Sequence, residues 1–462
     1  MLAREVLQEL IKVLGEENVL TEQEDLMTYA YDATAAMKHH KPDVVVSPNS
    51  TEQVAEVVKI AAKNNIPVYP RGSGTNLSGG TIPISGGIVL SMLNLNKIIE
   101  VDQDNLTATV QPGVIIQTLN NEVVKHGLLY PPDPGTVATA TMGGSLSECS
   151  GGLRGLKYGV TKHYIMGLQI VLANGEVIRW GGKTVKNVTG YDLVALFTGA
   201  EGTLGIITEI IVKLIPAPEA RKSILGVFDD VDKAGKAIAS IIRNKIIPAT
   251  LEIMDNVTIQ TVENFVHAGL PMDAQAVLLI EVDGYREVVE REAVLVEQIL
   301  KEEQAIEIKI AKNDQERDLI WLARRRALPA LAQKRPTTVL EDATVPRSKI
   351  PDMIKAIRKI AEKHNLQIAT FGHAGDGNLH PTILTDERDQ DEMKRVHLAV
   401  DEIFKTAISL GGTLSGEHGI GIAKMGYLDW EFGEAGVAAM RRMKEALDPN
   451  YLLNPGKIVR RD

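Results

Sequence analysis

The sequence predicts an α+β protein with two large domains. Its 462 residues exceed the roughly 250–300 residues at which a single hydrophobic core usually stops growing. Strand-like and helical patterns alternate early in the chain and return in a different order after Pro216-Ala-Pro218. We therefore place the first domain at residues 1–218, the second at 219–446, and a closing segment that returns to the first domain at 447–462.

The composition narrows the classes of function. With 44% hydrophobic residues the chain can bury a sizeable core, and its net charge of −10 argues against a nucleic-acid partner, which normally needs a basic face. The single cysteine, Cys149, excludes a disulfide framework and an iron–sulfur cluster bound by this chain alone. Any one-electron carriers are therefore expected elsewhere.

Nothing in the sequence predicts a membrane span. Residues 1–14 space leucine and valine helically among charges, unlike the apolar core of a signal peptide. No run approaches the roughly 18 apolar residues of a spanning helix. We therefore expect a cytoplasmic protein.

The first domain begins, after the helix of residues 1–14, with a strand–helix–strand unit. Asp43 to Ser47 has the composition of a buried strand, and Ser50-Thr-Glu-Gln53 matches a helix capping box. Valine and alanine follow the box at helical spacing, and a second strand is predicted from Ile66 to Tyr69.

A glycine-rich segment from Pro70 to Gly80 follows this second strand. Such a loop presents backbone N–H groups to phosphate oxygens. It fits neither the Rossmann nor the Walker pattern, because Thr81 to Leu93 is predicted to be a strand rather than a helix. A plain glycine-rich turn is the alternative.

Two further segments of small residues favour the ligand-binding interpretation. Thr139 to Gly152 follows Pro131-Pro-Asp-Pro-Gly135, and Gly199 to Gly205 precedes the strand-like Ile206 to Leu214. Three such segments beside apolar strands suit an extended ligand that is wrapped by backbone. Other strands are predicted at Thr107 to Val110, Gly167 to Ala173 and Glu176 to Trp180.

The second domain shows a βαββαβ order, which is typical of a ferredoxin-like antiparallel sheet with helices on one face. Its predicted elements are strand 223–228, helix 231–244, strand 249–254, strand 276–282, helix 287–302 and strand 305–310. A further helix carries Trp321-Leu-Ala-Arg-Arg-Arg326. A triple arginine is most often a solvated face, but one arginine turned inward would clamp a carboxylate.

The strongest functional signal is Phe371-Gly-His-Ala-Gly-Asp-Gly-Asn-Leu-His380 together with Gly416-Glu-His-Gly419. The glycine density excludes a regular helix, so His373 and His380 are predicted to be ligands on loops. With Glu417 they would form a two-histidine, one-carboxylate site for a divalent cation such as Zn²⁺, with positions open for a substrate.

His418 follows Glu417 directly, and neighbours in an extended segment point to opposite sides. We therefore assign His418 as a general base rather than a fourth ligand. Asp376 is either an Asx-turn former, a ligand or a partner of a ligand. The alternative is that these histidines are ordinary loop residues without a functional role, but their clustering with glycines disfavours it.

These motifs resemble a known family. Pro70 to Gly80, Thr139 to Gly152 and Gly190 to Thr208 are similar to the FAD-binding domain of the vanillyl-alcohol oxidase and p-cresol methylhydroxylase superfamily. The histidine motifs and Asn454-Pro-Gly-Lys457 resemble its D-2-hydroxyacid dehydrogenase branch, which includes FAD-dependent D-lactate dehydrogenases and the catalytic subunit of glycolate oxidase. The resemblance implies a two-part FAD-binding domain and a C-terminal cap domain with the ferredoxin-like sheet.

The resemblance also implies roles for individual residues. FAD would be non-covalent, because Thr75 stands where some members carry a histidine tethered to the flavin. Arg324 would grip the substrate carboxylate, His418 would be the base, and His373, His380 and Glu417 would hold Zn, Mn or Fe. The implied cofactor-binding residues are Arg71, Gly72, Ser73, Gly74, Thr75, Asn76, Gly79, Pro134, Gly135, Thr141, Gly143, Gly144, Ser147, Gly151, Gly202, Gly205, Ile206, Ile207 and Asn454.

The implied reaction is oxidation of a small D-2-hydroxy acid, with D-lactate first and glycolate next. Thr382, where relatives that handle diacids place a polar residue, favours a small monoacid. Electrons would pass to oxygen, a quinone, a cytochrome or a partner flavoprotein. We expect an electron-acceptor protein, such as an electron-transfer flavoprotein or another redox subunit. Peripheral association with a membrane is left open. The alternatives are a metal-dependent hydrolase and a non-catalytic flavin-binding subunit.

Overall fold

The computed structural model describes residues 2–461 and contains two compact units. The first consists of the residues up to Ser150, of Val160–Ala217 and of the residues from Glu417 onward. The second consists of Gly151–Gly159 and Pro218–Gly416. Within residues 2–461, no helix has both the length and the apolar composition needed to cross a bilayer.

The unit boundaries differ in part from the predicted domain boundaries. The units change at Ala217 and Pro218, beside the predicted limit of 218. The chain returns to the first unit at Glu417, well before residue 447. Helix α15 (Leu428–Leu447) belongs there because Lys444 donates hydrogen bonds to the carbonyls of Thr203 and Leu453, at 2.6 and 2.8 Å.

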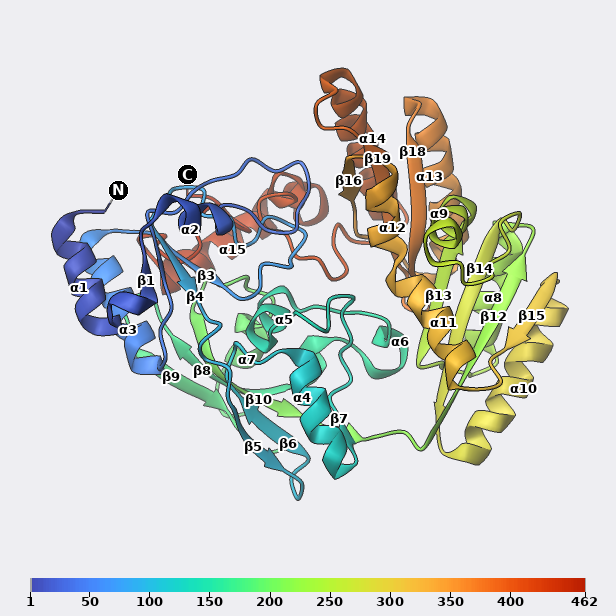
Figure 1. Cartoon of the computed structure of the whole chain (residues 1–462), viewed down its shortest axis with the longest axis horizontal. Helices are drawn as coiled ribbons and strands as arrows, with labels where there is room; N and C mark the ends of the chain where they lie inside the picture. Colours follow the sequence, from blue (N-terminus) through green and yellow to red (C-terminus); the bar gives the residue numbers. More distant parts are fainter. Residues whose placement is uncertain (1, 462) are drawn as a thin grey trace. The chain divides into compact units, whose positions relative to one another are not determined.

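The first unit contains a small mixed sheet and a larger antiparallel sheet (Figure 1). The small sheet has the order β1-β2-β4-β3, with β2, β4 and β3 parallel. The larger sheet has the order β5-β6-β10-β8-β9. The helices and strands of the first unit are α1 (Arg4–Leu14), β1 (Val19–Leu20), α2 (Gln23–Thr28), β2 (Val44–Val46), α3 (Thr51–Asn64), β3 (Val68–Arg71), β4 (Ile88–Ser91), β5 (Ile98–Asp102), β6 (Thr107–Val110), α4 (Ile116–Val123), β7 (Leu128–Leu129), α5 (Met142–Glu148), β8 (Ile165–Val171), β9 (Val177–Gly181), α7 (Leu193–Phe197), β10 (Ile206–Lys213), β11 (Ile215–Pro216) and α15.

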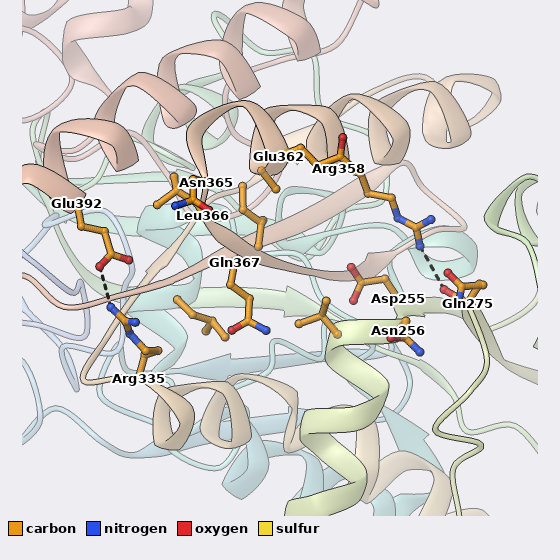
Figure 2. A pocket seen from close by; sticks show the side chains of 14 residues that line it. Asp255, Asn256, Gln275, Arg335, Arg358, Glu362, Asn365, Leu366, Gln367 and Glu392 are labelled. Atoms are coloured by element: carbon orange, nitrogen blue, oxygen red, sulfur yellow. Dashed lines mark hydrogen bonds and ion pairs between the residues drawn. The ribbon is translucent and has the colours of Figure 1, made fainter.

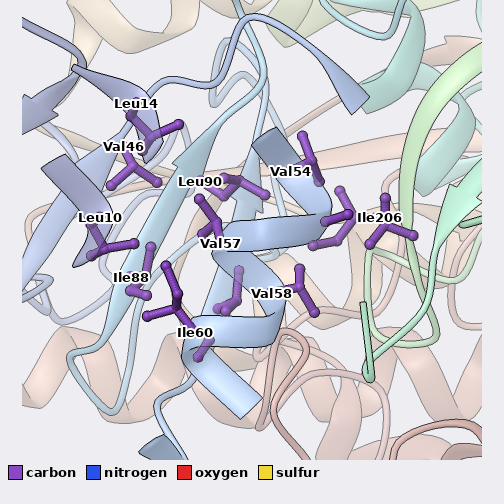
Figure 3. Close-up of a cluster of buried hydrophobic side chains, with 14 of the residues drawn as sticks. Leu10, Leu14, Val46, Val54, Val57, Val58, Ile60, Ile88, Leu90 and Ile206 are labelled. Atoms are coloured by element: carbon purple, nitrogen blue, oxygen red, sulfur yellow. The ribbon is translucent and has the colours of Figure 1, made fainter. Parts of the chain in front are cut away.

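The strand–helix–strand unit predicted from the sequence is present. Ser50 caps α3 by accepting the amide of Gln53 at 3.3 Å, as its place before the helical pattern predicts. The apolar sides of α1 and α3 pack on β2, β4 and β3, and Figure 3 shows this core with side chains such as Leu10, Val57 and Leu90. Burial of these side chains holds the first glycine-rich segment at the end of β3.

Two sequence predictions for the first unit were wrong. The strand predicted from Thr81 to Leu93 is confined to β4, because Gly86 and Gly87 turn the chain with φ of 68° and 77°. The segment of small residues from Thr139 to Gly152 was expected to be a loop but contains α5, which Thr141 caps by accepting the amide of Gly144 at 3.1 Å.

The second unit is built on one antiparallel sheet of eight strands, in the order β15-β12-β14-β13-β18-β19-β16, with β17 paired to β19. The first four strands have the ferredoxin-like order, and the hairpin of β18 and β19 extends the sheet. Its elements are α6 (Gly155–Tyr158), β12 (Ala220–Phe228), α8 (Val231–Arg243), β13 (Thr250–Asp255), α9 (Asn256–Val266), β14 (Ala276–Gly284), α10 (Arg286–Glu302), β15 (Glu307–Ile310), α11 (Asp314–Arg325), α12 (Ala327–Lys334), β16 (Thr337–Leu340), β17 (Ala343–Thr344), α13 (Ile350–His364), β18 (Gln367–His373), β19 (Asn378–Thr385) and α14 (Gln390–Ser409).

Helices cover both faces of this sheet, so the prediction of helices on one face was wrong (Figure 1). Helices α8 and α10 pack on one side, where Leu300 contacts Gly226. Helices α9, α11 and α12 pack on the other, in a core that includes Leu225, Met254 and Phe371. Helix α9 was not predicted; it follows β13 directly, with Asp255 as its N-cap.

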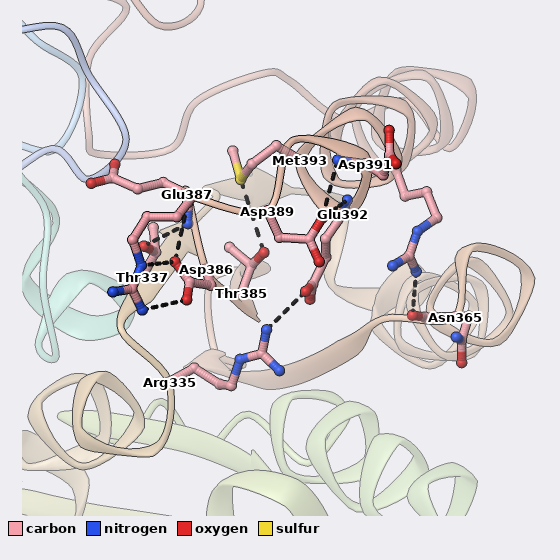
Figure 4. Close-up of polar contacts among 12 residues, drawn as sticks. Arg335, Thr337, Asn365, Thr385, Asp386, Glu387, Asp389, Asp391, Glu392 and Met393 are labelled. Atoms are coloured by element: carbon pink, nitrogen blue, oxygen red, sulfur yellow. Dashed lines mark hydrogen bonds and ion pairs between the residues drawn. The ribbon is translucent and has the colours of Figure 1, made fainter.

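Polar contacts fix the start of α14 (Figure 4). Asp389 caps the helix by accepting the amides of Asp391 and Glu392 at 3.1 and 2.9 Å. Arg335, between α12 and β16, forms an ion pair with Glu392 at 2.8 Å. These contacts lie at the end of β19, the strand that carries one of the predicted ligands.

Candidate active site

The two predicted metal-binding histidines lie on strands, and the prediction that they are loop ligands was wrong. His373 ends β18 and His380 lies in β19, joined by a tight hairpin in which His373 pairs with Asn378. The glycines serve this hairpin: a Cβ on Gly377, whose φ is 94°, would lie 2.0 Å from the carbonyl of Val345. Asp376 accepts the amide of Asn378 at 3.3 Å, as an Asx-turn former does.

His373 and His380 share one face of the sheet. His380 pairs with Phe371 across the hairpin, and His373 lies two residues further along the same strand, so all three side chains project to one side. The two rings are 5.1 Å apart between centroids and nearly perpendicular, at 88°. Both side chains are buried, and their ligand nitrogens lie within 4.8 Å of each other. The pair can therefore bind one cation.

Glu252 of β13 lies beside His373 on the same face. Its side chain is 0% exposed, and its Oε1 is 2.7 Å from Nδ1 of His373. Its Oε2 accepts Nε of Arg324 at 2.7 Å and lies 2.6 Å from Nη2 of the same guanidinium. Although burial alone raises the pKa of Glu252, its interactions with Arg324 and His373 lower that pKa overall. The carboxylate is therefore ionised and bridges the two residues.

Arg324 is the inward member of the triple arginine. Arg325 and Arg326 are exposed, whereas Arg324 is buried with its guanidinium 4.7 Å above the ring of Phe371. The expected inward arginine is thus present, but the carboxylate it clamps is that of Glu252. Its third nitrogen, Nη1, is the one that this contact leaves for a ligand.

Asp342 lies on the other side of His380. Its carboxylate is fully buried, with Oδ1 3.9 Å from Nδ1 of His380. Its Oδ2 accepts Oγ of Ser415 at 2.7 Å and the amide of Gly416 at 2.8 Å. Asp342 therefore fixes the turn that immediately precedes Glu417.

Glu417 and His418 are the two residues between this turn and a second anchored one. In the first unit, the amides of Ile420 and Gly421 donate to the two oxygens of Glu201 at 2.6 and 2.7 Å. Burial raises the pKa of Glu201 to about 7, and burial lowers the pKa of Lys457 to about 7. The backbone on either side of the predicted ligand and base is thus held by buried carboxylates.

The three glycine-rich segments predicted to bind a cofactor come together within the first unit. A Cβ on Gly72 would lie 2.4 Å from Oγ1 of Thr141, and one on Gly202 would lie 2.5 Å from Cγ of Pro70. Ser73 also donates to the carbonyl of Thr139 at 2.6 Å. Backbone groups of all three segments therefore share one region, which suits an extended ligand.

Several predicted cofactor residues hold this region together. Arg71 donates to the carbonyl of Tyr31 at 2.7 Å, and Asn76 donates to Asp32 at 2.7 Å. Asn454 is 1% exposed and donates to the carbonyls of Gly80 and Glu201 at 2.8 and 2.6 Å. The closing segment is thereby tied to two of the glycine-rich segments.

The remaining predicted cofactor residues are divided between the units. Gly151 begins the short segment Gly151–Gly159, which belongs to the second unit, where Lys157 bonds Asp283 at 2.5 Å. The others lie in the first unit, in or beside the glycine-rich segments: Gly74, Thr75, Gly79, Pro134, Gly135, Gly143, Gly144, Ser147, Gly205, Ile206 and Ile207.

A cavity of about 640 Å³ lies elsewhere in the second unit, where β13 and β18 part beyond Met254 and Phe371 (Figure 2). Its lining includes Asp255, Gln275, Arg335, Arg358 and Glu392. Among the described residues that line it, none belongs to the predicted site. The cavity is therefore not the candidate active site.

Sequence reasoning missed Glu252, Asp342 and Glu201. Glu252 and Glu201 lie in segments that are otherwise apolar or small, such as Leu251-Glu-Ile-Met254 within a predicted strand, whereas Asp342 follows another acidic residue, Glu341. A charged residue in a buried strand needs a partner, and that was the available signal. The partner could not be identified, because strand pairing joins residues distant in sequence.

Comparisons with known proteins agree with this division. A family model described as "FAD binding domain" matches residues 42–181, and one described as "FAD linked oxidases, C-terminal domain" matches residues 217–458. The chain is 50% identical to the glycolate oxidase subunit GlcD of Bacillus subtilis, over 100% of this chain and 98% of that protein. It is 35% identical to the D-lactate dehydrogenase of Anaerostipes hadrus, over 97% of this chain and 96% of that protein.

Solved structures share the fold at lower identity. A p-cresol methylhydroxylase with substrate bound superposes with a TM-score of 0.81 at 20% identity, covering 99% of this chain and 96% of that one. An alkyldihydroxyacetonephosphate synthase superposes with a TM-score of 0.78 at 21% identity, covering 98% and 86%. The α+β class, with a flavoprotein N-terminal domain and a C-terminal domain, is therefore confirmed.

Proposed function

Since the chain belongs to the family of FAD-linked oxidases, we propose that it oxidises a small D-2-hydroxy acid to the 2-oxo acid, with D-lactate favoured and glycolate next. The observation that carries the proposal is the buried His373–His380 pair beside Arg324, which offers cation ligands and a carboxylate-binding group on one sheet face. The relatives named for glycolate and D-lactate support the substrate class.

FAD binds through the N-terminal domain of this family. We assign its diphosphate to the region shared by Gly72–Asn76 and Gly143–Gly144, with further contacts from Gly202–Gly205. Backbone amides without side chains allow a diphosphate to approach closely, and that is the chemistry these segments offer. With Thr75 in the first segment the attachment is non-covalent.

A divalent cation fits the two buried histidines of the second unit. Oε1 of Glu252 holds Nδ1 of His373, which leaves Nε2 of His373 as the ligand atom. His380 is the second ligand, and Glu417 is assigned as the third, because the turn before it is fixed to Asp342 next to His380. Two imidazoles and a carboxylate leave positions open for a substrate.

The bound groups supply two kinds of chemistry: the cation makes the substrate hydroxyl more acidic, and FAD accepts a hydride from C2. The side chains supply the rest. His418 accepts the hydroxyl proton at a ring nitrogen, and Nη1 of Arg324 binds the substrate carboxylate. Because Phe371 and Glu252 hold the guanidinium, the carboxylate is oriented and not merely attracted.

Thr382 favours a small substrate. It lies two residues beyond His380 on β19, so its side chain projects to the same face, and it is 0% exposed. Its hydroxyl bonds the carbonyl of His380 at 3.3 Å. A second substrate carboxylate would find a short, already bonded hydroxyl there instead of a charged or long polar group.

We propose that the electrons leave through another protein. The chain carries a single cysteine, which is too few to ligate an iron–sulfur cluster of its own. A relative with 50% identity is named a subunit, which supports a redox partner such as an electron-transfer flavoprotein or another redox subunit.

The proposal is tested by measuring 2-oxo acid formation from D-lactate with an artificial electron acceptor. His418→Ala should lower kcat roughly 10²–10⁴-fold, as loss of a general base does, and leave the flavin bound. Arg324→Ala should mainly raise KM. His397→Ala and Arg326→Ala, at exposed positions, are the matched controls. A His418→Ala enzyme that turns over at the wild-type rate would contradict the assignment.

A further inference from the structure

Glu252 contacts both a proposed metal ligand, His373, and the proposed substrate clamp, Arg324. We propose that Glu252 is a positioning residue that makes His373 a metal ligand and allows Arg324 to work beside a divalent cation. The inference rests on the proposed function and adds a residue to it.

The fold places Glu252 for this double contact. Strand β13 pairs with β18 at Ile253 and Gly372, so Glu252 lies next to His373 in the register. Helix α11 crosses the same face and brings Arg324 to the other carboxylate oxygen. With 0% of the side chain exposed, each oxygen is satisfied by one of these residues.

The contact selects the state of His373. A carboxylate 2.7 Å from Nδ1 accepts a hydrogen bond there, so the proton of the neutral imidazole resides on Nδ1. Nε2 then carries the lone pair that a cation needs. Carboxylates that orient metal-bound histidines in this way typically change the metal affinity 10–100-fold when they are removed.

The same carboxylate reduces the repulsion between Arg324 and a bound divalent cation. A guanidinium and a divalent cation repel each other when they bind one small substrate inside a buried site. Glu252 neutralises Arg324 through Nε and Nη2, and it stands between Arg324 and His373. Arg324 therefore keeps Nη1 for the substrate carboxylate without opposing the cation.

The experiment measures Zn²⁺ and Mn²⁺ binding to the full-length flavoprotein by equilibrium dialysis and elemental analysis, together with D-lactate affinity. Glu252→Gln should weaken Zn²⁺ binding roughly 10–100-fold, because its amide cannot accept from Nδ1 and bond Arg324 at once. It should also weaken D-lactate binding and leave the flavin content unchanged, since the glycine-rich segments lie in the first unit.

The matched control is Glu281→Gln. Glu281 is a buried glutamate on the adjacent strand β14, where it bonds Ser223 at 3.0 Å and Trp321 at 3.1 Å. Zn²⁺ affinity should not change in this variant. If Glu252→Gln fails to fold, the double variant Glu252→Leu with Arg324→Leu leaves no buried charge unpaired and offers Nδ1 of His373 no acceptor, so it should show the same loss of Zn²⁺ affinity.

Two outcomes separate this inference from the proposed function. If Glu252→Gln binds Zn²⁺ as tightly as the wild type does, and D-lactate reduces the flavin of the wild-type protein, the role of Glu252 is overturned and the proposed function stands. Failure of D-lactate, glycolate and other small 2-hydroxy acids to reduce the wild-type flavin, with no cation bound, would overturn both.

Discussion

The buried carboxylate of Asp342 accepts the amide of Gly416 at 2.8 Å, while its other oxygen lies 3.9 Å from Nδ1 of His380. One side chain thus relates a proposed metal ligand to the turn that leads into Glu417 and His418. Beyond these two residues, the amides of Ile420 and Gly421 donate to the two carboxylate oxygens of Glu201.

Replacing Asp342 should disturb catalysis more than folding. In Asp342→Asn an NH₂ group replaces one of the two carboxylate oxygens. The side chain then no longer has one oxygen facing the amide of Gly416 and a second oxygen facing His380. We expect flavin reduction by D-lactate to slow roughly tenfold to a hundredfold through misplacement of Glu417 and His418. Stopped-flow measurement checks this, with Asp352→Asn, an exposed partner of Lys349, as the control. An unchanged rate in Asp342→Asn would remove Asp342 from the account.

Glu201 should matter for stability as well as rate. In Glu201→Gln the side-chain oxygen can accept one of the two amides of Ile420 and Gly421, and the other amide faces an NH₂ group. We expect the free energy of unfolding to fall by about 1–3 kcal/mol, as for a buried donor left unsatisfied. Urea denaturation measures this, and Glu209→Gln, in an exposed ion pair with Arg179, should show little change.

Asp255 should make stability depend on pH. Burial raises its pKa from 3.8 to about 6, against the hydrogen bonds from Thr258 and Thr370. Because the folded state holds the proton more tightly, this residue stabilises the fold below pH 4 and loses that contribution as the pH rises through 6.

Asp255→Asn keeps the N-cap of α9 but cannot ionise. Relative to wild type, this variant should gain on the order of 3 kcal/mol between pH 4 and pH 7. Urea midpoints of both proteins across this range provide the test, and a constant difference between them would be inconsistent with the raised pKa.

Gly377 should be essential to the β18–β19 hairpin. Gly377→Ala adds a Cβ 2.0 Å from the carbonyl of Val345 at a φ of 94°. Strain and overpacking together should destabilise the protein by about 3 kcal/mol. Gly269→Ala, at a φ of 75° with nothing within 4 Å, carries the backbone strain alone and should cost about 1–2 kcal/mol. Thermal unfolding and Zn²⁺ retention distinguish the two, and equal losses would show that the hairpin tolerates a side chain.

The sequence predicted the parts of the molecule that local pattern determines. Ser50 and the valines that follow it predicted α3, and the order of elements from Ser223 to Ile310 predicted the ferredoxin-like strands. For the triple arginine the residues alone favoured a solvated face, and the inward Arg324 was implied by the family resemblance.

Long-range pairing limited the rest. The glycines of Phe371–His380 suggested a loop, whereas they allow close contacts of a hairpin: Gly372 with the carbonyl of Asn378 across it, and Gly377 with the carbonyl of Val345 outside it. The partner of Arg324 was expected to be a substrate, because Glu252 lies 72 positions away and only the register of β13 against β18 brings it near. Helix α5 was missed because glycine and serine carry little helical signal.

The most direct test of the central claim is the visible spectrum of the anaerobic protein before and after addition of D-lactate, and separately of L-lactate. The account predicts that D-lactate bleaches the flavin absorption and that L-lactate does not, with bleaching lost in His418→Ala while the flavin stays bound. A flavin that D-lactate and glycolate leave oxidised, in protein supplied with FAD and Zn²⁺ or Mn²⁺, would contradict the proposed reaction.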